Sequence, residues 1–163
     1  MKYKIATLFN ICFFTLLISV KAQYYTSIMP AFYTNAGNNG DRFTFAAEFG
    51  KQWDVFSIGL DIGKTNMNTQ HAKDTTWYSE IRTNLNVFQQ NKFTNTLTMG
   101  LGYIFNAHQN IMIETTTGVE YSVNGNFHLN IFFGTYFFSG KNSASNNNFF
   151  GMSAVRFFHR NKQ

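Results

Sequence analysis

The 163-residue sequence is poor in cysteine, proline and charge. It contains one cysteine and one proline, and 13% of its residues are charged. Ordinary soluble domains carry roughly 25% charged residues, so a large part of this chain is not expected to face water. Cys12 falls in an N-terminal apolar stretch, which leaves the remainder without disulfides or a thiolate nucleophile. With 44% apolar residues the composition is not that of a disordered protein, and the length indicates one domain.

The N-terminal segment has the three parts of a secretory signal peptide. Two lysines precede an apolar stretch over residues 5–20, and residues 20–22 read Val-Lys-Ala, with the small residues that signal peptidase prefers. The apolar stretch is shorter than the roughly 20 residues that a membrane-spanning helix needs. We therefore expect residues 1–22 to be a cleaved signal peptide and residues 23–163 to form the exported domain.

Removal of this segment changes the charge balance. The whole chain has a net charge of +5, and loss of Lys2, Lys4 and Lys21 leaves ten basic against eight acidic residues, a net charge of +2. The remaining lysines are scattered singly, whereas nucleic-acid binding requires basic residues clustered on one face. We therefore expect no nucleic-acid partner.

Alternation of apolar and polar residues with a period of two recurs along the exported chain. No apolar run there approaches 20 residues, which argues against membrane-spanning helices. Six segments alternate clearly and the two flanking ones more weakly, and at about 9 to 13 residues most are long for globular strands but suited to tilted membrane strands. Pro30 predicts a bulge or a local break in the first strand. The expected strands are residues 24–34, 42–50, 55–63, 76–88, 94–105, 111–123, 127–138 and 148–158.

The connections between these strands alternate between long and short. An outer-membrane barrel with both termini in the periplasm has long extracellular loops and short periplasmic turns. Residues 35–41, 64–75 and 139–147 are therefore expected to be extracellular loops. At the short connection 124–126, direct pairing of Val123 with Phe127 predicts a three-residue turn. The expected connections are 35–41, 51–54, 64–75, 89–93, 106–110, 124–126 and 139–147.

The charged residues of the expected strands lie on the face opposite the apolar residues. An Arg or Lys facing lipid at the bilayer midplane costs about 2 to 4 kcal/mol, and every lysine is expected in a turn, loop or tail. The lumen of an eight-stranded barrel is just filled by side chains. We predict that it holds a structural ionic network in which some carboxylates share protons or pair with a histidine. Its members are Arg42, Glu48, Asp61, Glu80, Arg82, Glu114, Glu120, His128 and Arg156.

Two soluble folds are the alternatives to a membrane barrel. A lipocalin-like barrel needs an apolar lumen and a charged exterior, and a β-sandwich needs polar outer faces and more proline in its turns. Aromatic residues instead cluster where strands meet turns, which predicts two interfacial girdles. In the last strand, Phe149, Val155 and Phe157 are assigned to the lipid face and Arg156 to the lumen. The aromatics assigned to the girdles include Tyr25, Tyr33, Tyr78, Phe149 and Phe157.

The region from residue 23 to about residue 158 resembles the small eight-stranded outer-membrane β-barrel proteins, the group that includes the OmpA transmembrane domain and OmpX. The resemblance rests on the signal peptide, the eight alternating strands, the loop asymmetry and the terminal strand ending Val155-Arg156-Phe157-Phe158. A polar tail over residues 159–163 departs from the usual aromatic terminus. The resemblance implies an all-β, antiparallel up-and-down transmembrane barrel in the outer membrane. Its implied partners are outer-membrane lipid, including lipopolysaccharide, and the barrel-assembly machinery during insertion.

One group of lumenal residues has the composition of a catalytic site. The expected register places Ser122 opposite His128 and Glu120 opposite Asn130, and nucleophilic catalysis uses such a serine, histidine and carboxylate. Some barrels of the resembled group are lipid A deacylases with a lipid-facing His-x-Ser pair, whereas this chain has His128-Leu129-Asn130 facing inward. We therefore expect no enzyme activity. The four histidines show no zinc-site spacing, and we expect neither a metal nor a cofactor.

Function is therefore expected to reside in the polar loops and the surrounding lipid. The leading interpretation is an integral outer-membrane protein with a structural or surface-interaction role, carried by loops 35–41, 64–75 and 139–147. The alternatives are a narrow channel and a lipid-modifying outer-membrane enzyme.

Overall fold

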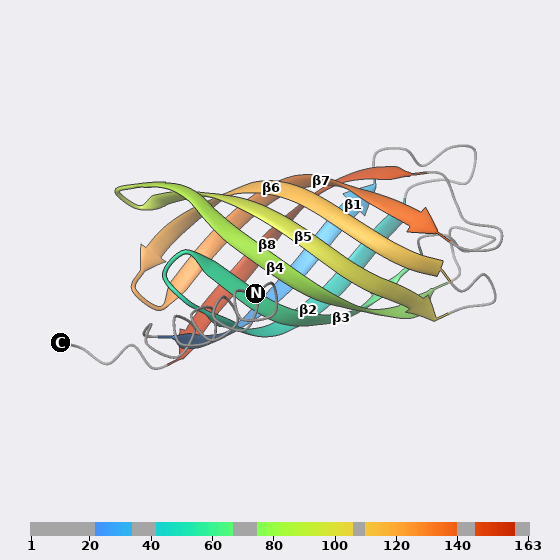
Figure 1. Ribbon diagram of the computed structural model, residues 1–163, viewed down its shortest axis with the longest axis horizontal. Helices are drawn as coiled ribbons and strands as arrows, with labels where there is room; N and C mark the ends of the chain where they lie inside the picture. Colours follow the sequence, from blue (N-terminus) through green and yellow to red (C-terminus); the bar gives the residue numbers. More distant parts are fainter. Residues whose placement is uncertain (1–21, 34–41, 67–74, 106–109, 140–145, 159–163) are drawn as a thin grey trace, which may run out of the picture.

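The computed structural model describes residues 22–33, 42–66, 75–105, 110–139 and 146–158. Within these ranges the chain forms one closed antiparallel β-barrel (Figure 1). The predicted signal peptide and the polar tail lie outside the described residues, apart from Ala22. The strands are β1 (Gln23–Tyr33), β2 (Arg42–Gln52), β3 (Phe56–Thr65), β4 (Thr76–Gln90), β5 (Phe93–Phe105), β6 (Asn110–Asn124), β7 (Phe127–Ser139) and β8 (Asn147–Phe158).

Each strand pairs with the next one along the chain, and β8 closes the barrel against β1. The closing seam is long, since it runs from Tyr24 opposite Phe158 to Tyr33 opposite Phe149. Closure leaves no sheet edge with unpaired backbone groups, which is the condition for a sheet to exist in lipid. The described part of the chain contains no helix long and apolar enough to cross a membrane. The predicted eight-stranded up-and-down topology is confirmed.

The period-two pattern of the sequence becomes the two faces of the barrel wall. In β3, Ser57, Gly59 and Asp61 are buried in the lumen, while Ile58 and Leu60 are exposed on the outer surface. The same arrangement, polar inside and apolar outside, holds for most strands. It is the reverse of a water-soluble barrel, so the predicted polar lumen and apolar exterior are confirmed.

The two ends of the barrel differ in their connections (Figure 1). At the short-turn end lie residues 53–55, 91–92 and 125–126, together with the start of β1 and the end of β8. At the long-loop end lie the connections that the structure describes only in part. The predicted loops 35–41, 64–75 and 139–147 fall largely outside the described residues. Their boundaries are partly wrong, because residues 64 and 65 belong to β3, residue 139 ends β7 and residue 147 begins β8.

All three short turns are tighter than predicted, and the β2–β3 turn consists of residues 53–55 rather than 51–54. The β6–β7 turn consists of Gly125 and Asn126, because a bulge at Val123 absorbs one residue between the Ser122–His128 pair and the turn. The prediction of a three-residue turn is therefore wrong, although the register above it is correct. The β4–β5 turn consists of residues 91 and 92 rather than 89–93, again beside a bulge. Bulges of this kind add one residue to one strand and raise its local twist.

Pro30 interrupts the barrel on one side only. β1 continues through it, and its register with β2 is unbroken. Its ladder with β8 skips Met29 and Pro30 and resumes at Ala31 without a shift. The predicted local break is therefore present and the alternative, a bulge, is not, as expected when proline removes a single N–H donor.

The last strand faces the opposite way from the prediction. Phe149 and Phe157 point into the barrel, whereas Phe150 and Arg156 are exposed outside. Arg156 lies near the short-turn end with its guanidinium carbon 5.8 Å from the ring centroid of Phe158. Both faces of β8 are largely apolar, so alternation alone could not choose between them. Pairing with β1 and β7 decides the orientation.

Two lysines lie within strands, contrary to the prediction. Lys51 belongs to β2 and Lys64 to β3, and both are on the outer face close to a strand end. The Lys51 ammonium lies 5.1 Å from the ring centroid of Trp53, and that of Lys64 lies 4.9 Å from the ring centroid of Trp77. Near the membrane interface such a side chain can bury its stem against apolar surface and keep its charge hydrated.

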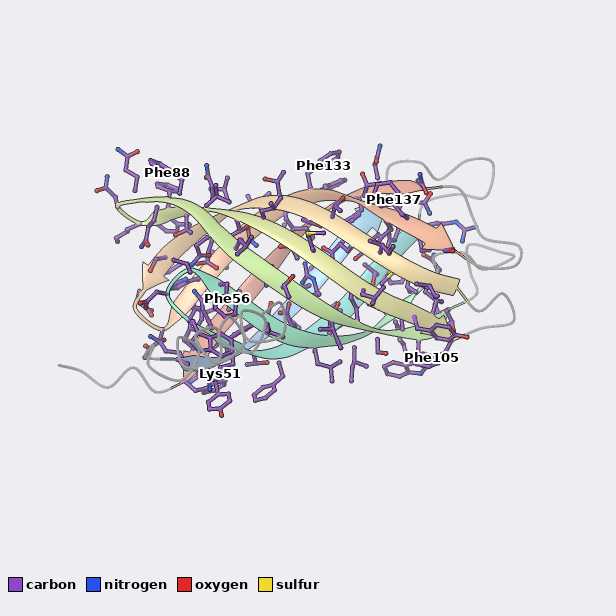
Figure 2. The ribbon with its side chains drawn as sticks, in the orientation of Figure 1. Lys51, Phe56, Phe88, Phe105, Phe133 and Phe137 are labelled. Carbon is purple, nitrogen blue, oxygen red and sulfur yellow. The ribbon has the colours of Figure 1, made fainter. Side chains whose placement is uncertain are left out.

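The outer aromatic residues mark both ends of the barrel. Figure 2 shows Phe88 and Lys51 near the short-turn end, Phe105 and Phe137 near the long-loop end, and Phe133 between them. Many other aromatics that were assigned to the girdles are instead inside the barrel. Those buried in the lumen are Tyr25, Tyr33, Tyr78, Phe149 and Phe157.

Candidate functional site: the lumen and its short-turn vestibule

Arg82 forms the centre of the lumen. From β4 its Nε and Nη2 donate to the two carboxylate oxygens of Glu114 on β6 at 2.8 and 2.9 Å. Its Nη1 donates to Glu48 Oε2 on β2 at 2.9 Å. All three side chains are buried. Bidentate arginine–carboxylate pairs are strong and directional, so the guanidinium joins one side of the barrel to the other.

Glycines in the neighbouring strands make room for this cluster. Gly59 on β3 and Gly100 on β5 lie directly opposite Arg82. A Cβ at Gly59 would collide with the side chain of Glu48, and one at Gly100 would collide with that of Glu80. The charged side chains of the cluster fit in the lumen only because the neighbouring inner-face positions are glycine.

Carboxyl groups outnumber the arginine at this level. Glu48, Asp61 and Glu80 are direct neighbours across β2, β3 and β4. Tyr25 donates a hydrogen bond to Glu48, and Tyr78 donates to Asp61 Oδ2 at 3.0 Å. Both oxygens of Glu80 and Oδ1 of Asp61 have no hydrogen-bond partner among the described residues. The cluster thus depends on one guanidinium for its charge compensation within the described part of the chain.

On the long-loop side of this cluster the lumen is packed with apolar side chains. Tyr136 and Phe149 stack with ring centroids 4.2 Å apart, and Tyr33 packs against both. The sequence pattern does not predict this aromatic plug, because it assigns Tyr33, Tyr78 and Phe149 to the girdles. It gives Phe132 and Tyr136 no place. The detectable signal is that Tyr136 and Phe149 share their strand face with glycines. The buried apolar cluster comprises Met29, Ala31, Tyr33, Ala46, Tyr78, Ile104, Met112, Phe132, Tyr136 and Phe149.

On the short-turn side the lumen opens into a vestibule. The vestibule is a cavity of about 340 Å³ whose lining includes Gln52, Asn86, Glu120 and His128. A second cavity of about 40 Å³ shares Gln52, Asn86 and Glu120 with it and reaches Arg82. Polar space therefore extends from the short-turn end to the ionic cluster.

Ser122, His128 and Glu120 form a hydrogen-bonded chain in the vestibule wall. His128 Nδ1 lies 2.7 Å from Glu120 Oε1, and its Nε2 lies 3.2 Å from Ser122 Oγ. The Ser122 hydroxyl also lies within donor distance of the Asn124 carbonyl, at 3.1 Å. The three have the order of nucleophile, base and orienting carboxylate. The neighbouring backbone N–H of Ser122 is bonded to the Lys92 carbonyl, so it does not contribute an oxyanion donor.

The structure divides the nine predicted network residues among four places. Glu48, Asp61, Glu80, Arg82 and Glu114 lie together at the centre. Glu120 and His128 pair in the vestibule.

The two remaining arginines lie apart from that network. Arg42 lies near the long-loop end, where it donates to the backbone carbonyl of Asn66. Arg156 is outside the barrel, so its assignment to the lumen is wrong. Within the described residues there is no group of three or more His, Cys, Asp or Glu side chains placed to hold a metal ion.

Comparison with known proteins identifies the fold but not a sequence family. No protein-family model matches the chain, and no curated protein matches it. The N-terminal β-barrel domain of Pseudomonas aeruginosa OprF superposes with a TM-score of 0.65 at 12% identity, over 83% of this chain and 97% of that one. Neisserial surface protein A gives 0.58 at 14% identity, over 84% and 97%.

A de novo designed transmembrane β-barrel superposes with a TM-score of 0.55 at 12% identity, over 83% of this chain and 95% of that one. These likenesses show that the chain has the fold of small eight-stranded transmembrane β-barrels. In particular, it has the fold of the small outer-membrane barrels to which the OprF domain and the neisserial protein belong. The predicted resemblance is confirmed at the level of the fold.

Proposed function

We propose that the protein is an integral outer-membrane barrel with a closed lumen, whose structural or surface-interaction role is carried by its long-loop end. The observation that carries the proposal is the double obstruction of the lumen. The Arg82 cluster crosses the barrel, and the aromatic plug fills the lumen beyond it. A closed lumen leaves the outer wall and the loops as the surfaces available to partners.

The outer-membrane location is supported by three independent features. The outer face is apolar along the strands, the termini of the barrel meet at the short-turn end, and the similar solved structures are transmembrane barrels. A signal peptide at residues 1–22 would direct the chain across the inner membrane and would then be cleaved. Insertion would then use the barrel-assembly machinery.

The loops are proposed to be the recognition surface. The parts of the expected loops that lie outside the strands, residues 35–41, 66–75 and 140–146, are rich in Asn, Ser, Thr, Gly and Lys. This composition suits hydrogen bonding to surface glycans, lipopolysaccharide or another protein. Replacing each loop by a Gly-Ser segment of equal length should retain the barrel, read from outer-membrane fractionation and heat-modifiable gel migration. The loop variants should show the same surface phenotype as a deletion strain, and wild-type behaviour of all three loop variants would contradict the proposal.

A narrow channel is the second candidate function. The vestibule and the smaller cavity beyond it supply polar space up to Arg82, so conduction would require rearrangement of the guanidinium and of the plug. Planar-bilayer recording of the purified protein separates the two candidates. We expect no large, stable conductance, and its observation would favour the channel.

A lipid-modifying enzyme is the third candidate, and it depends on the Ser122–His128–Glu120 chain. In that reaction Ser122 Oγ would attack an acyl ester carbonyl while His128 Nε2 takes the hydroxyl proton. The ester C–O bond would break, the lipid alcohol would leave with the proton from His128, and water would then hydrolyse the acyl-serine to release the fatty acid and restore Ser122. Lipid A mass spectrometry on strains with and without the protein tests it. An altered lipid profile that is restored by wild type but not by Ser122→Ala would establish the enzyme.

A further inference from the structure

A groove lies on the outer wall of the barrel, toward the long-loop end. It has a volume of about 410 Å³ and opens to the surface that faces lipid. Strands β3 to β6, which run side by side, provide its walls. Its lining residues on the outer face are Leu60, Ser79, Ile81, Leu101, Tyr103 and Ile111, and the inward-facing Glu80 and Gly102 also border it.

The groove exists because a small residue interrupts a row of large ones. Ser79 is paired with Ile62 on one side and with Tyr103 on the other, and Tyr103 is paired with Ile111. The short serine side chain leaves a depression among these larger neighbours. Five of the eight lining residues are apolar or aromatic, and the charged one, Glu80, is buried on the lumen side of the wall. The depression therefore suits a hydrocarbon chain rather than a polar ligand.

A cation lies directly beyond the groove at the long-loop end. Lys64 is paired with Trp77, which is paired with Phe105, and this row is two residues closer to the strand ends than Ser79. Lys64 is exposed, and its ammonium lies 4.9 Å from the Trp77 ring centroid. No described carboxylate forms an ion pair with it. The outer wall thus has a groove wide enough for a hydrocarbon chain, with a positive charge just beyond it at the long-loop end.

We propose that Lys64 and the groove bind one molecule of a phosphorylated, acylated glycolipid of the lipid A type. The ammonium pairs with a phosphate, and one acyl chain lies in the groove. Long loops of barrels with this fold are extracellular, and the extracellular leaflet of such an outer membrane is built from lipid A. This inference rests on the proposed outer-membrane location, but it is independent of the loops and the lumen.

The opposite end of the barrel provides a matched control. Lys51 is also on the outer face, and its ammonium lies 5.8 Å from the ring centroid of Tyr24 and 5.1 Å from that of Trp53. It differs from Lys64 in facing the other leaflet, because it lies at the short-turn end. Thr83 is the corresponding control for the groove, since it is exposed on the same face of β4 as Ser79 but does not line the cavity.

The test uses the full chain expressed in a Gram-negative host. Outer-membrane fractionation and heat-modifiable migration first establish location and folding, so a failure of the proposed location is seen separately. The folded protein in detergent is then titrated with diphosphoryl lipid A and followed by native mass spectrometry. We expect Lys64→Gln to weaken binding about fivefold, the contribution of one lysine near an anionic headgroup. Ser79→Leu, which fills the groove, should also weaken it severalfold.

The control titrations decide whether this site is responsible. Lys51→Gln and Thr83→Leu should bind like wild type, and dephosphorylated lipid A should bind Lys64→Gln and wild type equally. Equal losses in Lys64→Gln and Lys51→Gln would overturn the site, as would undiminished binding by Ser79→Leu. Phosphatidylglycerol binding as tightly as lipid A would overturn the assignment of the ligand.

Discussion

The two halves of the lumen contain different kinds of side chain. From Arg82 toward the long-loop end the space is filled by stacked aromatic and aliphatic side chains. From Arg82 toward the short-turn end it is lined by amides, hydroxyls and the Glu120–His128 pair around open cavities. The lumen is therefore closed at the long-loop end and accessible to water from the short-turn end, with the charged cluster at the boundary.

This difference shows where stability and access are located. A packed aromatic cluster contributes hydrophobic burial and close contacts, whereas residues beside a water-filled cavity can exchange partners with little cost. Substitutions in the long-loop half of the lumen should therefore lower the free energy of unfolding strongly, and substitutions in the short-turn half should lower it little.

The largest contrast is expected in thiol accessibility, because the chain beyond residue 22 has no cysteine of its own. Ser122→Cys places a thiol in the vestibule, and Ala46→Cys places one in the plug, where the alanine is 2% exposed. The first thiol should react with a small charged methanethiosulfonate reagent, and the second should react only after unfolding. Mass spectrometry of the folded protein reads both, and rapid labelling of Ala46→Cys would show that the plug is open.

Loss of the central arginine should cause the largest loss of stability. Arg82→Met leaves Glu48 and Glu114 buried without their cation, and breaking a buried ion pair in this way costs about 3 to 5 kcal/mol. Urea unfolding in lipid vesicles, followed by tryptophan fluorescence, measures the change. Arg156→Met on the outer wall is the control, with an expected change of about 1 kcal/mol or less. Equal losses in the two variants would contradict the boundary role of Arg82.

Truncation of the plug should be slightly less damaging. Phe149 is fully buried and contacts Tyr33, Phe132 and Tyr136, and Phe149→Ala should lower the free energy of unfolding by about 3 kcal/mol. Thr94→Ala in the vestibule should change it by about 1 kcal/mol or less. The same urea titration checks both, and a large effect of Thr94→Ala would mean that the vestibule is a packed region.

The smallest effect is expected for the hydrogen-bonded chain of the vestibule. Glu120 and His128 retain 15% and 18% side-chain exposure, so Glu120→Ala should cost about 1 kcal/mol or less. Ser122→Ala should cost about the same, since it removes one neutral hydrogen bond. A loss as large as that of Arg82→Met would show that this chain, rather than the central cluster, holds the lumen together.

Most of the barrel wall could be predicted from the alternation of residues, because lipid and lumen select opposite side chains at every second position. The register at Ser122 and His128 also followed, since it depends on the faces of two adjacent strands. The length of the β6–β7 turn could not be predicted in this way. A bulge at Val123 exchanges one residue between strand and turn, and alternation cannot distinguish these two arrangements.

The contents of the lumen were predicted less completely. The five central charged residues were identified because charge is costly on a lipid face. Arg156 was misplaced because β8 is apolar on both faces. The aromatic plug was missed for a related reason: an aromatic ring near a strand end suits the interface and the interior equally well.

The sequence by itself therefore determined an eight-stranded barrel with an apolar exterior and a charged interior, since burial in lipid acts on each residue separately and leaves a local pattern. Tertiary structure alone decided which charges meet, which aromatics fill the lumen and where the cavities and the outer groove lie. Those features depend on the stagger of non-adjacent strands around a closed sheet. Arg82, Glu48 and Glu114 come from three different strands, and no local pattern records that they converge.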